Sequence, residues 1–278
     1  MELAEDYVAD SSMQYRDTSD LVDEFSRELS QMEGKCLDIG CGPGRITKEM
    51  LLTLLPEESK IVGADISHTM INYARNCNSD ERISYIVLDI ETSHLPNDEI
   101  EKYHNAVSFY CLHWCNDICR AFENIHKLLR PKGKALIMFL GYHFGFEAYT
   151  RLKQNPRFKP YLHDAHRYVP FFQRNCSVKN MRASLQTMLK NIGFKILHCT
   201  QREKSFRYSR ESLKNHAYAV NPFINRFPDD KIKNEFLEQL INEIMSQNVP
   251  LKNKNNEDYI ILRYQLLIAF VQKPPSTA

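Results

Sequence analysis

The ten-residue stretch Lys35–Gly44, Lys-Cys-Leu-Asp-Ile-Gly-Cys-Gly-Pro-Gly, constrains the fold of this chain more than any other. An apolar run containing Asp38 leads into three glycines at alternate positions, and an amphipathic run follows. This order predicts a strand over 35–39, a tight turn, and a helix over 45–55. Glycines let a ligand approach a sharply turned backbone, and the free N–H groups of the next helix point at the same place. The sequence therefore predicts a ligand site at this turn.

Two classes of ligand bind such turns, and Asp38 distinguishes between them. A dinucleotide site needs G-x-G-x-x-G, with the pyrophosphate at the helix N-terminus. Here the third glycine, Gly44, comes one position early, and Arg45 stands where a dehydrogenase would have glycine. The carboxylate of Asp38, two residues before Gly40, would repel a pyrophosphate and attract a cation. We therefore expect a ligand such as S-adenosylmethionine, whose α-ammonium group is cationic.

Apolar segments alternate with amphipathic ones along most of the chain, which predicts βαβ units and a parallel sheet. Ser67 is a suitable N-cap, and Arg130-Pro131-Lys132-Gly133 is a strong turn signal. The expected helices cover 5–33, 45–55, 68–77, 117–129 and 179–191, and the expected strands cover 35–39, 60–64, 83–88, 106–110, 134–140, 194–201 and 259–271.

Two segments interrupt this alternation. Residues 141–178 show no clean period and are dense in aromatic side chains, and residues 203–250 read as a second, helical insertion. A polar loop is expected over 252–258. We expect one domain, 1–278, in which these insertions form a lid over the substrate. Its parts are a helical cap (1–34), a cofactor-binding core (35–140), two lid insertions (141–178 and 203–258) and the rest of the core (179–202 and 259–273).

Three consecutive predicted strands each end in an aspartate: Asp38, Asp65 and Asp89. Ligands of open parallel sheets bind at the carboxyl ends of the strands. Asp65 is placed to accept hydrogen bonds from ribose hydroxyls, and Asp89 to accept one from an adenine amino group beside the backbone of Ile90. One such acid is commonly a turn or cap residue, but three in consecutive units favour a nucleoside site.

Composition excludes several classes of protein. The chain has 278 residues, a formal net charge of +1, 43% hydrophobic and 26% charged residues. Near-neutral charge argues against a nucleic-acid surface, and no apolar run approaches the roughly 18 residues of a membrane span. The acidic N-terminus lacks the features of a signal peptide, so we expect a cytoplasmic protein whose eight cysteines are mostly reduced thiols.

The motif Asp-Ile-Gly-Cys-Gly-Pro-Gly resembles that of class I S-adenosylmethionine-dependent methyltransferases. The resemblance covers about 35–140 and, more weakly, 179–201 and 259–272. It implies a Rossmann-like, seven-stranded, mostly parallel sheet with an antiparallel last strand and helices on both faces. The implied cofactor is S-adenosyl-L-methionine. The expected cofactor-binding residues are Asp38, Gly40, Cys41, Gly42, Gly44, Asp65, Ile66, Asp89, Ile90, Ser108 and Phe109.

Further stretches resemble the insect-type juvenile hormone acid methyltransferases over most of the chain. They are Gln14 with Arg16-Asp17, then residues 87–91, 108–114, 120–125 and 139–141, and Asn221-Pro222-Phe223. Those enzymes methylate the carboxylate of farnesoic acid or its epoxide. The resemblance implies that Gln14 and Trp114 hold the substrate carboxylate.

Carboxylate methylation needs positioning more than base catalysis. A carboxylate, with a reference pKa of about 4, is already ionised at pH 7. Gln14 and Trp114 offer neutral N–H donors, so we assign both as catalytic positioning groups. His113 would serve as a general base for a hydroxyl or amine substrate, and as a positioning group for an acid.

The lid aromatics are expected to surround the apolar tail of the acid, although a second small core is the plain alternative. Four insertion arginines, Arg151, Arg157, Arg167 and Arg174, favour an anionic ligand. We expect a small apolar carboxylic acid as partner, with no nucleic acid, membrane or metal. The expected substrate-binding residues are Gln14, Tyr110, Trp114, Phe144, Phe146, Tyr149, Tyr168, Phe171, Phe172, Tyr218 and Phe223.

Other interpretations stay open or are set aside. The enzyme could methylate a fatty or dicarboxylic acid, or the chain could be a non-catalytic binding module, which the intact glycine and aspartate motif disfavours. Cys111, Cys115 and Cys119 are spaced C-x3-C-x3-C, which matches no common zinc site, and we expect Cys115 and Cys119 to be buried thiols on a helix. Asn221-Pro222-Phe223 is expected to be a lid turn.

Overall fold

The computed structural model describes residues 4–248, 251–252 and 258–276. Over those residues it contains an eight-stranded sheet in the order β3-β2-β1-β4-β5-β8-β6, with β7 paired to β8. Strands β1 to β5 pair in parallel, while β8 is antiparallel to both β5 and β6. The expected fold class is confirmed. The strands are β1 (Lys35–Ile39), β2 (Lys60–Asp65), β3 (Ile83–Val87), β4 (Tyr103–Phe109), β5 (Leu129–His143), β6 (Lys195–Ser209), β7 (Leu251–Lys252) and β8 (Asp258–Gln272).

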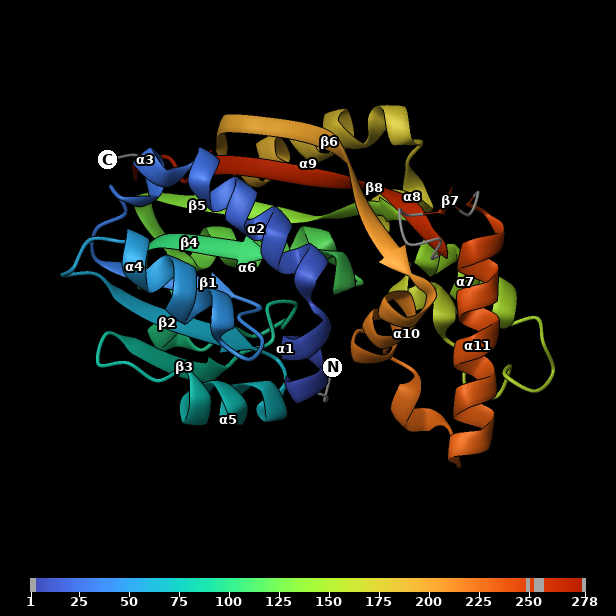
Figure 1. The fold of residues 1–278 in the computed structure, drawn as a ribbon. Helices are drawn as coiled ribbons and strands as arrows, with labels where there is room; N and C mark the ends of the chain where they lie inside the picture. The colour runs from blue at the N-terminus through green and yellow to red at the C-terminus, as the bar shows by residue number, and fades with distance from the viewer. Residues whose placement is uncertain (1–3, 249–250, 253–257, 277–278) are drawn as a thin grey trace.

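Both faces of the sheet are covered by helices because alternate side chains of each central strand point to opposite faces. In β5, Leu136 and Met138 pack with helices α2 (Ser12–Glu24), α3 (Ser26–Leu29) and the turn η1 (Thr47–Leu51) with α4 (Leu52–Leu54). Ile137 and Phe139 pack with α6 (Ile118–Leu128) and α9 (Met181–Ile192) on the other face. Figure 1 shows α2 crossing the near face of the sheet in front of β4 and β5. Helix α5 (His68–Cys77) packs on β2 and β3 and begins at Ser67, which accepts the backbone N–H of Met70.

The N-terminal region departs from the single helix expected over 5–33. It forms α1 (Ala4–Asp10), α2 and α3, with non-helical backbone angles at Ser11 and Phe25. The expected apolar face, which includes Leu21 and Leu29, is buried. The break at Ser11 lets α2 follow the sheet while α1 leaves it to contact α10 and α5. Local periodicity could not predict this bend, because both helices keep a helical pattern.

Three further boundaries differ from those expected. The helix over 45–55 contains the π-helical turn η1. The turn at 130–133 is an irregularity within β5, where Lys132 has a φ of 68°. Strand β6 continues to Ser209, so residues 203–209 are strand rather than helical insertion. The long partner β8 pairs with it as far as Tyr259, which supplies backbone hydrogen bonds that the sequence pattern of β6 alone does not reveal.

The two insertions form helices beyond one end of the sheet. Figure 1 shows α7, α10 and α11 gathered past the ends of β6 and β8, with α1 beside α10. Of the expected polar loop, 253–257 lie outside the described residues, and its first residue, Lys252, belongs to β7, an eighth strand that the seven-stranded expectation lacked. No helix in the described ranges is both long and apolar enough to cross a bilayer. The remaining elements are α7 (Phe144–Leu152), α8 (Phe171–Asn175), α10 (Arg210–Ala219), α11 (Asp230–Ser246) and the short turns η2 (Asn97–Glu99), η3 (Leu112–Trp114), η4 (Ala165–Tyr168), η5 (Val178–Asn180) and η6 (Ile224–Arg226).

Candidate active site

The turn after β1 requires glycine for steric reasons. Gly40 has a φ of 73°, and a Cβ built there would lie 2.3 Å from Sγ of Cys111. Gly44 has a φ of 81°, and its Cβ would lie 2.6 Å from the hydroxyl of Tyr85. Any larger residue would therefore displace Cys111 in the loop after β4 or the side chain of Tyr85 on β3. The backbone N–H of Gly42 donates to the carboxylate of Asp65 at 3.0 Å, which ties this turn to the end of β2.

Asp38 is a buried carboxylate that lacks a cationic partner. Only 3% of Asp38 is exposed, and the hydroxyl of Thr47 donates to it at 2.6 Å. Burial raises the pKa of Asp38 to about 7, against the Thr47 hydrogen bond and with a contribution from the nearby Asp65 carboxylate. No cationic side chain pairs with Asp38 in the described part of the chain. A cationic ligand group beside Asp38 would compensate this buried charge.

Asp65 and Asp89 complete the series of strand-end carboxylates. The two oxygens of Asp65 accept the backbone N–H groups of Gly42 and Ser67, and burial raises its pKa. Asp89 accepts the backbone N–H of Glu91 at 2.9 Å. Asp89 is thus oriented by its own turn, and Asp65 by its own turn and by the glycine turn after β1. Asp38 and Asp65 lie in the last two residues of β1 and β2, and Asp89 follows β3, so all three lie at the carboxyl ends of parallel strands.

Three adjoining cavities lie over these strand ends. We call them the Asp38, Asp65 and Asp89 cavities after the carboxylate that each contains, and their volumes are about 540, 740 and 490 Å³. Gly40 lines all three, and Ile90 lines the Asp89 cavity. Together they suit an elongated ligand with a cation at one end, hydroxyls in the middle and a flat polar group at the other end. The residues present therefore fit S-adenosylmethionine.

A fourth cavity, of about 640 Å³, lies between the sheet and the insertions, and we call it the apolar cavity. Leu140, Phe146 and Tyr149 line it from β5 and α7, and Leu213 and Leu240 from α10 and α11. Its polar lining comes mainly from Gln14, His113, Trp114, His143 and His216.

The four cavities meet around a few shared side chains. Gln14 lines the Asp38 cavity and the apolar cavity, and Trp114 lines the apolar, Asp65 and Asp89 cavities. Tyr7 and Tyr110 line the Asp38, Asp65 and apolar cavities. Sequence reasoning missed Tyr7, because nothing in the local pattern of α1 distinguishes it from an ordinary helix residue. The structure thus brings Gln14 and Trp114 together where the apolar cavity adjoins the carboxylate series.

His113 is buried at this junction, with 4% exposed. Burial lowers its pKa to about 3, with a further contribution from His143. Its Nδ1 and the amide oxygen of Gln14 are buried without a hydrogen-bond partner among the described residues. A neutral imidazole of such low pKa is a weak base at pH 7, which favours positioning over proton abstraction. Unpartnered buried polar atoms on either side of a cavity are consistent with a polar ligand between them.

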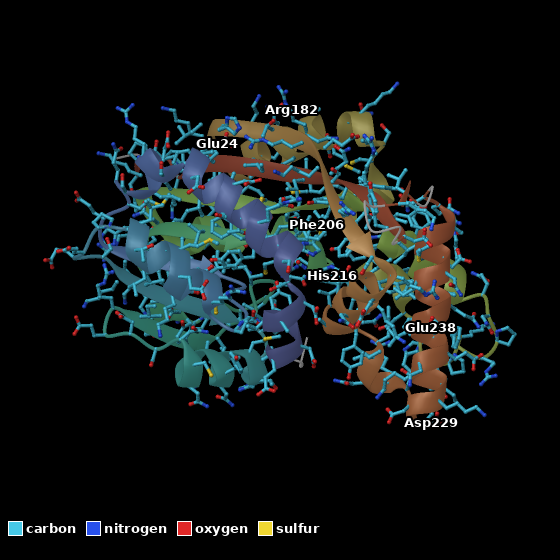
Figure 2. The ribbon with its side chains drawn as sticks, viewed as in Figure 1. Glu24, Arg182, Phe206, His216, Asp229 and Glu238 are labelled. Carbon is cyan, nitrogen blue, oxygen red and sulfur yellow. The ribbon has the colours of Figure 1, made fainter. Side chains whose placement is uncertain are left out.

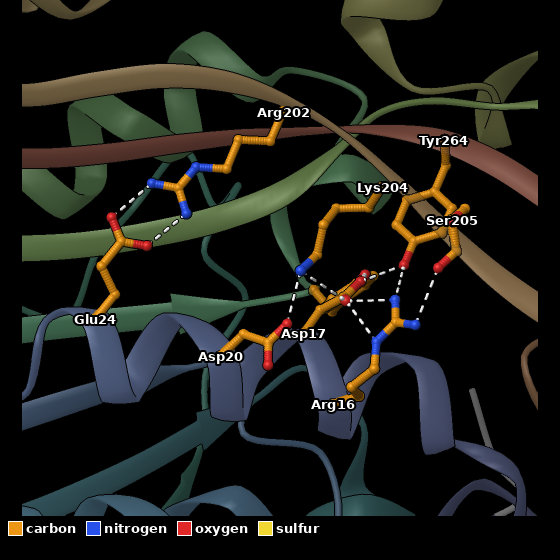
Figure 3. A network of polar contacts seen from close by, with 9 residues as sticks. Arg16, Asp17, Asp20, Glu24, Arg202, Lys204, Ser205 and Tyr264 are labelled. Carbon is orange, nitrogen blue, oxygen red and sulfur yellow. Dashed lines mark hydrogen bonds and ion pairs between the residues drawn. The ribbon is translucent and has the colours of Figure 1, made fainter.

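Asp17 holds helix α2, which carries Gln14, against the sheet. Its side chain is fully buried, and it accepts the hydroxyls of Tyr110 at 2.6 Å and Tyr264 at 2.5 Å. Arg16 donates to Asp17 at 2.7 Å and to the backbone oxygen of Ser205 at 2.9 Å. Figure 3 shows this network spanning α2, β6 and β8. Gln14 lies one helical turn before Asp17, so the network holds the turn of α2 that carries Gln14 against the sheet.

The remaining predicted residues divide into lining and supporting positions. Phe146, Tyr149 and Tyr168 line cavities, whereas Phe223 is buried against Tyr149 and Tyr168, and Phe172 is buried against Phe139. Among the described residues that line the four cavities, Phe144, Phe171 and Tyr218 do not occur. Phe146, Tyr149 and Tyr168 therefore stay candidates for substrate binding, whereas no cavity contact supports that role for Phe144, Phe171, Phe172, Tyr218 or Phe223 among the described residues. The expected cofactor residues Cys41, Ile66 and Phe109 line cavities, while Gly44 and Ser108 lie behind them, the latter bonded to the backbone oxygen of Ile39.

The structure also tests the predictions made for two cysteines and for the Asn221-Pro222-Phe223 turn. Cys115 is buried as expected, but Cys119 is exposed on α6, so the expectation of a buried thiol there is wrong. Helical spacing predicted a shared face, but α6 begins only at Ile118, so Cys115 lies in the loop before it and the two thiols are not on one helix. In the turn after α10, the side chain of Asn221 accepts the backbone N–H of Phe223 at 2.8 Å, and Pro222 lines the Asp65 cavity.

Comparisons with known proteins agree with this geometry. Residues 37–137 match the family described as Methyltransferase domain. The chain is 31% identical over 272 residues to juvenile hormone acid O-methyltransferase of Drosophila melanogaster, which covers 95% of this chain and 90% of that protein. The enzyme of the same name from Bombyx mori is 28% identical, and the match covers 92% of this chain and 91% of that enzyme. A solved structure described as a putative methyltransferase from Bacillus halodurans is 15% identical to this chain, with a TM-score of 0.57. The match covers 92% of this chain and 99% of that protein. At this identity it shows a similar fold and nothing more.

Proposed function

We propose that this chain, which belongs to the juvenile hormone acid O-methyltransferase family and is an S-adenosylmethionine-dependent O-methyltransferase, forms the methyl ester of a sesquiterpenoid carboxylic acid. The substrate is juvenile hormone acid or farnesoic acid. The observation that carries the proposal is an apolar cavity whose polar end, at Gln14 and Trp114, adjoins the buried carboxylates of Asp38 and Asp65.

Three carboxylates would hold the cofactor. Asp38 would pair with the α-ammonium group, Asp65 with the ribose hydroxyls, and Asp89, beside Ile90, with the adenine amino group. When bound, S-adenosylmethionine supplies a sulfonium methyl group that a carboxylate oxygen attacks in line with the carbon–sulfur bond. The glycine turn at Gly40 admits the ligand without steric hindrance from a Cβ.

The protein's own contribution is orientation in a dry site. Gln14 and Trp114 present neutral N–H donors, which orient a carboxylate without the tight ion pair that would reduce its nucleophilicity. Well-oriented reactants gain roughly 7–11 kcal/mol in favourable cases. His113, whose pKa burial lowers to about 3, stays neutral beside them. Charge is neutralised during transfer, so the exclusion of water by Phe146 and Tyr149 favours reaction.

The arginines of the insertion do not favour a dicarboxylic acid. Arg151 lies 3.7 Å from Glu243, and Arg157 lies 2.8 Å from Glu235. Arg167 and Arg174 are exposed. None of the four lines the apolar cavity among its described residues. A second carboxylate in the tail would therefore lack a cationic partner, whereas a terpenoid tail matches the apolar lining.

The direct test is methyl transfer from labelled S-adenosylmethionine to farnesoic acid, its epoxide, a long-chain fatty acid, trans-aconitate and a phenol. Ester formed with the two terpenoid acids alone is the expected result. Label on trans-aconitate or the phenol would contradict the proposed substrate class while leaving the methyltransferase assignment intact.

Replacing Gln14 tests the polar end of the cavity. Gln14→Leu should lower kcat/KM for the terpenoid acid roughly 10- to 100-fold, because one hydrogen bond to a charged group is lost. The Kd of S-adenosylmethionine, measured by calorimetry, should change less than about 2-fold, since its carboxylate partners are untouched. Gln31→Leu, at an exposed position, serves as the control. Full activity of Gln14→Leu would remove Gln14 from the site.

A further inference from the structure

The apolar cavity contains a hydrogen-bond donor that the reaction does not use. His143, the last residue of β5, lines this cavity, and its Nδ1 accepts the backbone N–H of Gly145 at 3.0 Å. In a neutral imidazole the single ring proton must then lie on Nε2. This Nε2 is buried and has no hydrogen-bond partner among the described residues. Leaving a buried donor unsatisfied is costly, so a ligand acceptor at this point would stabilise the complex.

His216, on α10, lines the same cavity. Its Nε2 is a hydrogen-bond acceptor, whereas Nε2 of His143 is a donor. The Nδ1 of His216 lies 2.9 Å from the backbone oxygen of Asp10 at the end of α1. Figure 2 shows His216 on the side of α10 that faces α1. A carbonyl only accepts, so Nδ1 carries the proton and Nε2 is an acceptor. Burial lowers the pKa of both histidines, that of His143 to about 3, so both rings are neutral at pH 7.

His143 is linked to the carboxylate-binding end of the cavity through the ring of Phe146. The ring of Phe146 contacts both groups, with its centroid 5.6 Å from that of Trp114 and 5.9 Å from that of His143. An acid held at Gln14 and Trp114 whose tail runs along Phe146 would therefore meet His143 in the same cavity. A neutral donor suits an uncharged oxygen in that tail better than a second carboxylate, because no cation lines this cavity among the described residues.

We infer that Nε2–H of His143 donates to a neutral oxygen in the tail of the acid, of the ether, oxirane, hydroxyl or carbonyl class, so that the enzyme prefers an oxygenated acid to its hydrocarbon counterpart. The inference rests on the proposed function, since it places the carboxylate of the same acid at Gln14 and Trp114. It adds a second polar contact that sets specificity for the tail.

His143→Asn is the sharpest variant. Asparagine keeps an acceptor for the backbone N–H of Gly145 but is too short to place a donor where Nε2 lies. In the wild-type enzyme, kcat/KM for farnesoic acid epoxide should exceed that for farnesoic acid by about 10-fold, the effect of one hydrogen bond. In His143→Asn this ratio should fall to about one, with the value for farnesoic acid changed less than about 2-fold.

His198→Asn is a matched control. Its Nε2 is also buried without a partner in the described chain, but its ring packs against Phe25, 5.5 Å between centroids, outside the cavity. The preference for the epoxide should stay at the wild-type value in this variant. Equal losses with both acids in His143→Asn, or no preference in the wild-type enzyme, would overturn the inference.

Binding separates this inference from the proposed function. Calorimetry with S-adenosylhomocysteine present would compare dodecanoic acid with its analogue in which an ether oxygen replaces one methylene near the chain end. The analogue should bind more tightly to the wild-type enzyme and equally well to His143→Asn. If neither terpenoid acid is methylated but this difference persists, the proposed function fails and the His143 contact stands. If the wild-type enzyme and His143→Asn each methylate the two terpenoid acids with equal kcat/KM, the proposed function stands and the His143 contact fails.

Discussion

Asp38→Asn should weaken S-adenosylmethionine binding about 100-fold, the effect of losing a charged partner worth about 3 kcal/mol. The carboxylate is buried, with Thr47 as its hydrogen-bond donor and no cationic side chain beside it in the described chain. An asparagine keeps the shape and the Thr47 contact but cannot compensate an ammonium group. Isothermal calorimetry would measure the affinity, and thermal unfolding would show that the fold is kept.

The same carboxyl should make cofactor binding depend on pH. Burial raises the pKa of Asp38 to about 7, and a cationic ligand requires the ionised form. Below pH 7 the free protein must release a proton before the pair forms, so affinity should fall roughly tenfold per pH unit; above pH 7 it should level off. Calorimetry in buffers of different ionisation enthalpy would detect the released proton.

Glu99→Gln is the control for both measurements. Glu99 is also a buried carboxylate, hydrogen-bonded to Tyr103 and Lys102, but it lines none of the four cavities among the residues described. Its replacement should leave the pH dependence of cofactor affinity in place, whereas Asp38→Asn should abolish it. Unchanged affinity in Asp38→Asn would remove Asp38 from the cofactor site.

Asp17→Ala should lower the free energy of unfolding by about 3 kcal/mol or more, because it leaves buried groups without their charged partner. The hydroxyls of Tyr110 and Tyr264 lose their acceptor, and Arg16 loses its ion pair. For a chain of this size the midpoint of thermal unfolding should fall by about 5 °C. Differential scanning calorimetry with a denaturant series would measure both quantities.

Asp17 should also affect catalysis through Gln14, one helical turn away on α2. With α2 no longer fixed to β4 and β8, kcat should fall even with saturating cofactor at a temperature where the variant is folded. Asp17→Asn, which keeps an acceptor for the tyrosines, should recover part of kcat. Asp20→Ala on the same helix removes an exposed contact with Lys204 and should cost less than about 1 kcal/mol. Loss of stability with an unchanged kcat would leave Asp17 a purely structural residue.

Much of the core could be predicted from the sequence because its signals are local. The glycine turn at Gly40 and the apolar strands that end at Asp38, Asp65 and Asp89 each occupy a few consecutive residues. Their meeting at one edge follows from the rule for parallel sheets. Ser67 was predicted to cap a helix, and it accepts the backbone N–H of Met70. Gln14 and Trp114 came from family resemblance, since an isolated glutamine or tryptophan has many uses.

Which residues line the apolar cavity opposite the carboxylate series depends on the tertiary structure alone. Tyr7, His143 and His216 come from α1, β5 and α10, and nothing in their local sequence distinguishes them from ordinary helix or strand residues. Their roles depend on which backbone group each ring nitrogen meets: Gly145 for His143, and Asp10, 206 positions away, for His216. The sequence by itself determined the sheet and the carboxylates at its edge, because periodicity and turn chemistry act over a few residues. The shape and polarity of the apolar cavity depend on contacts between distant segments, which only the folded chain brings together.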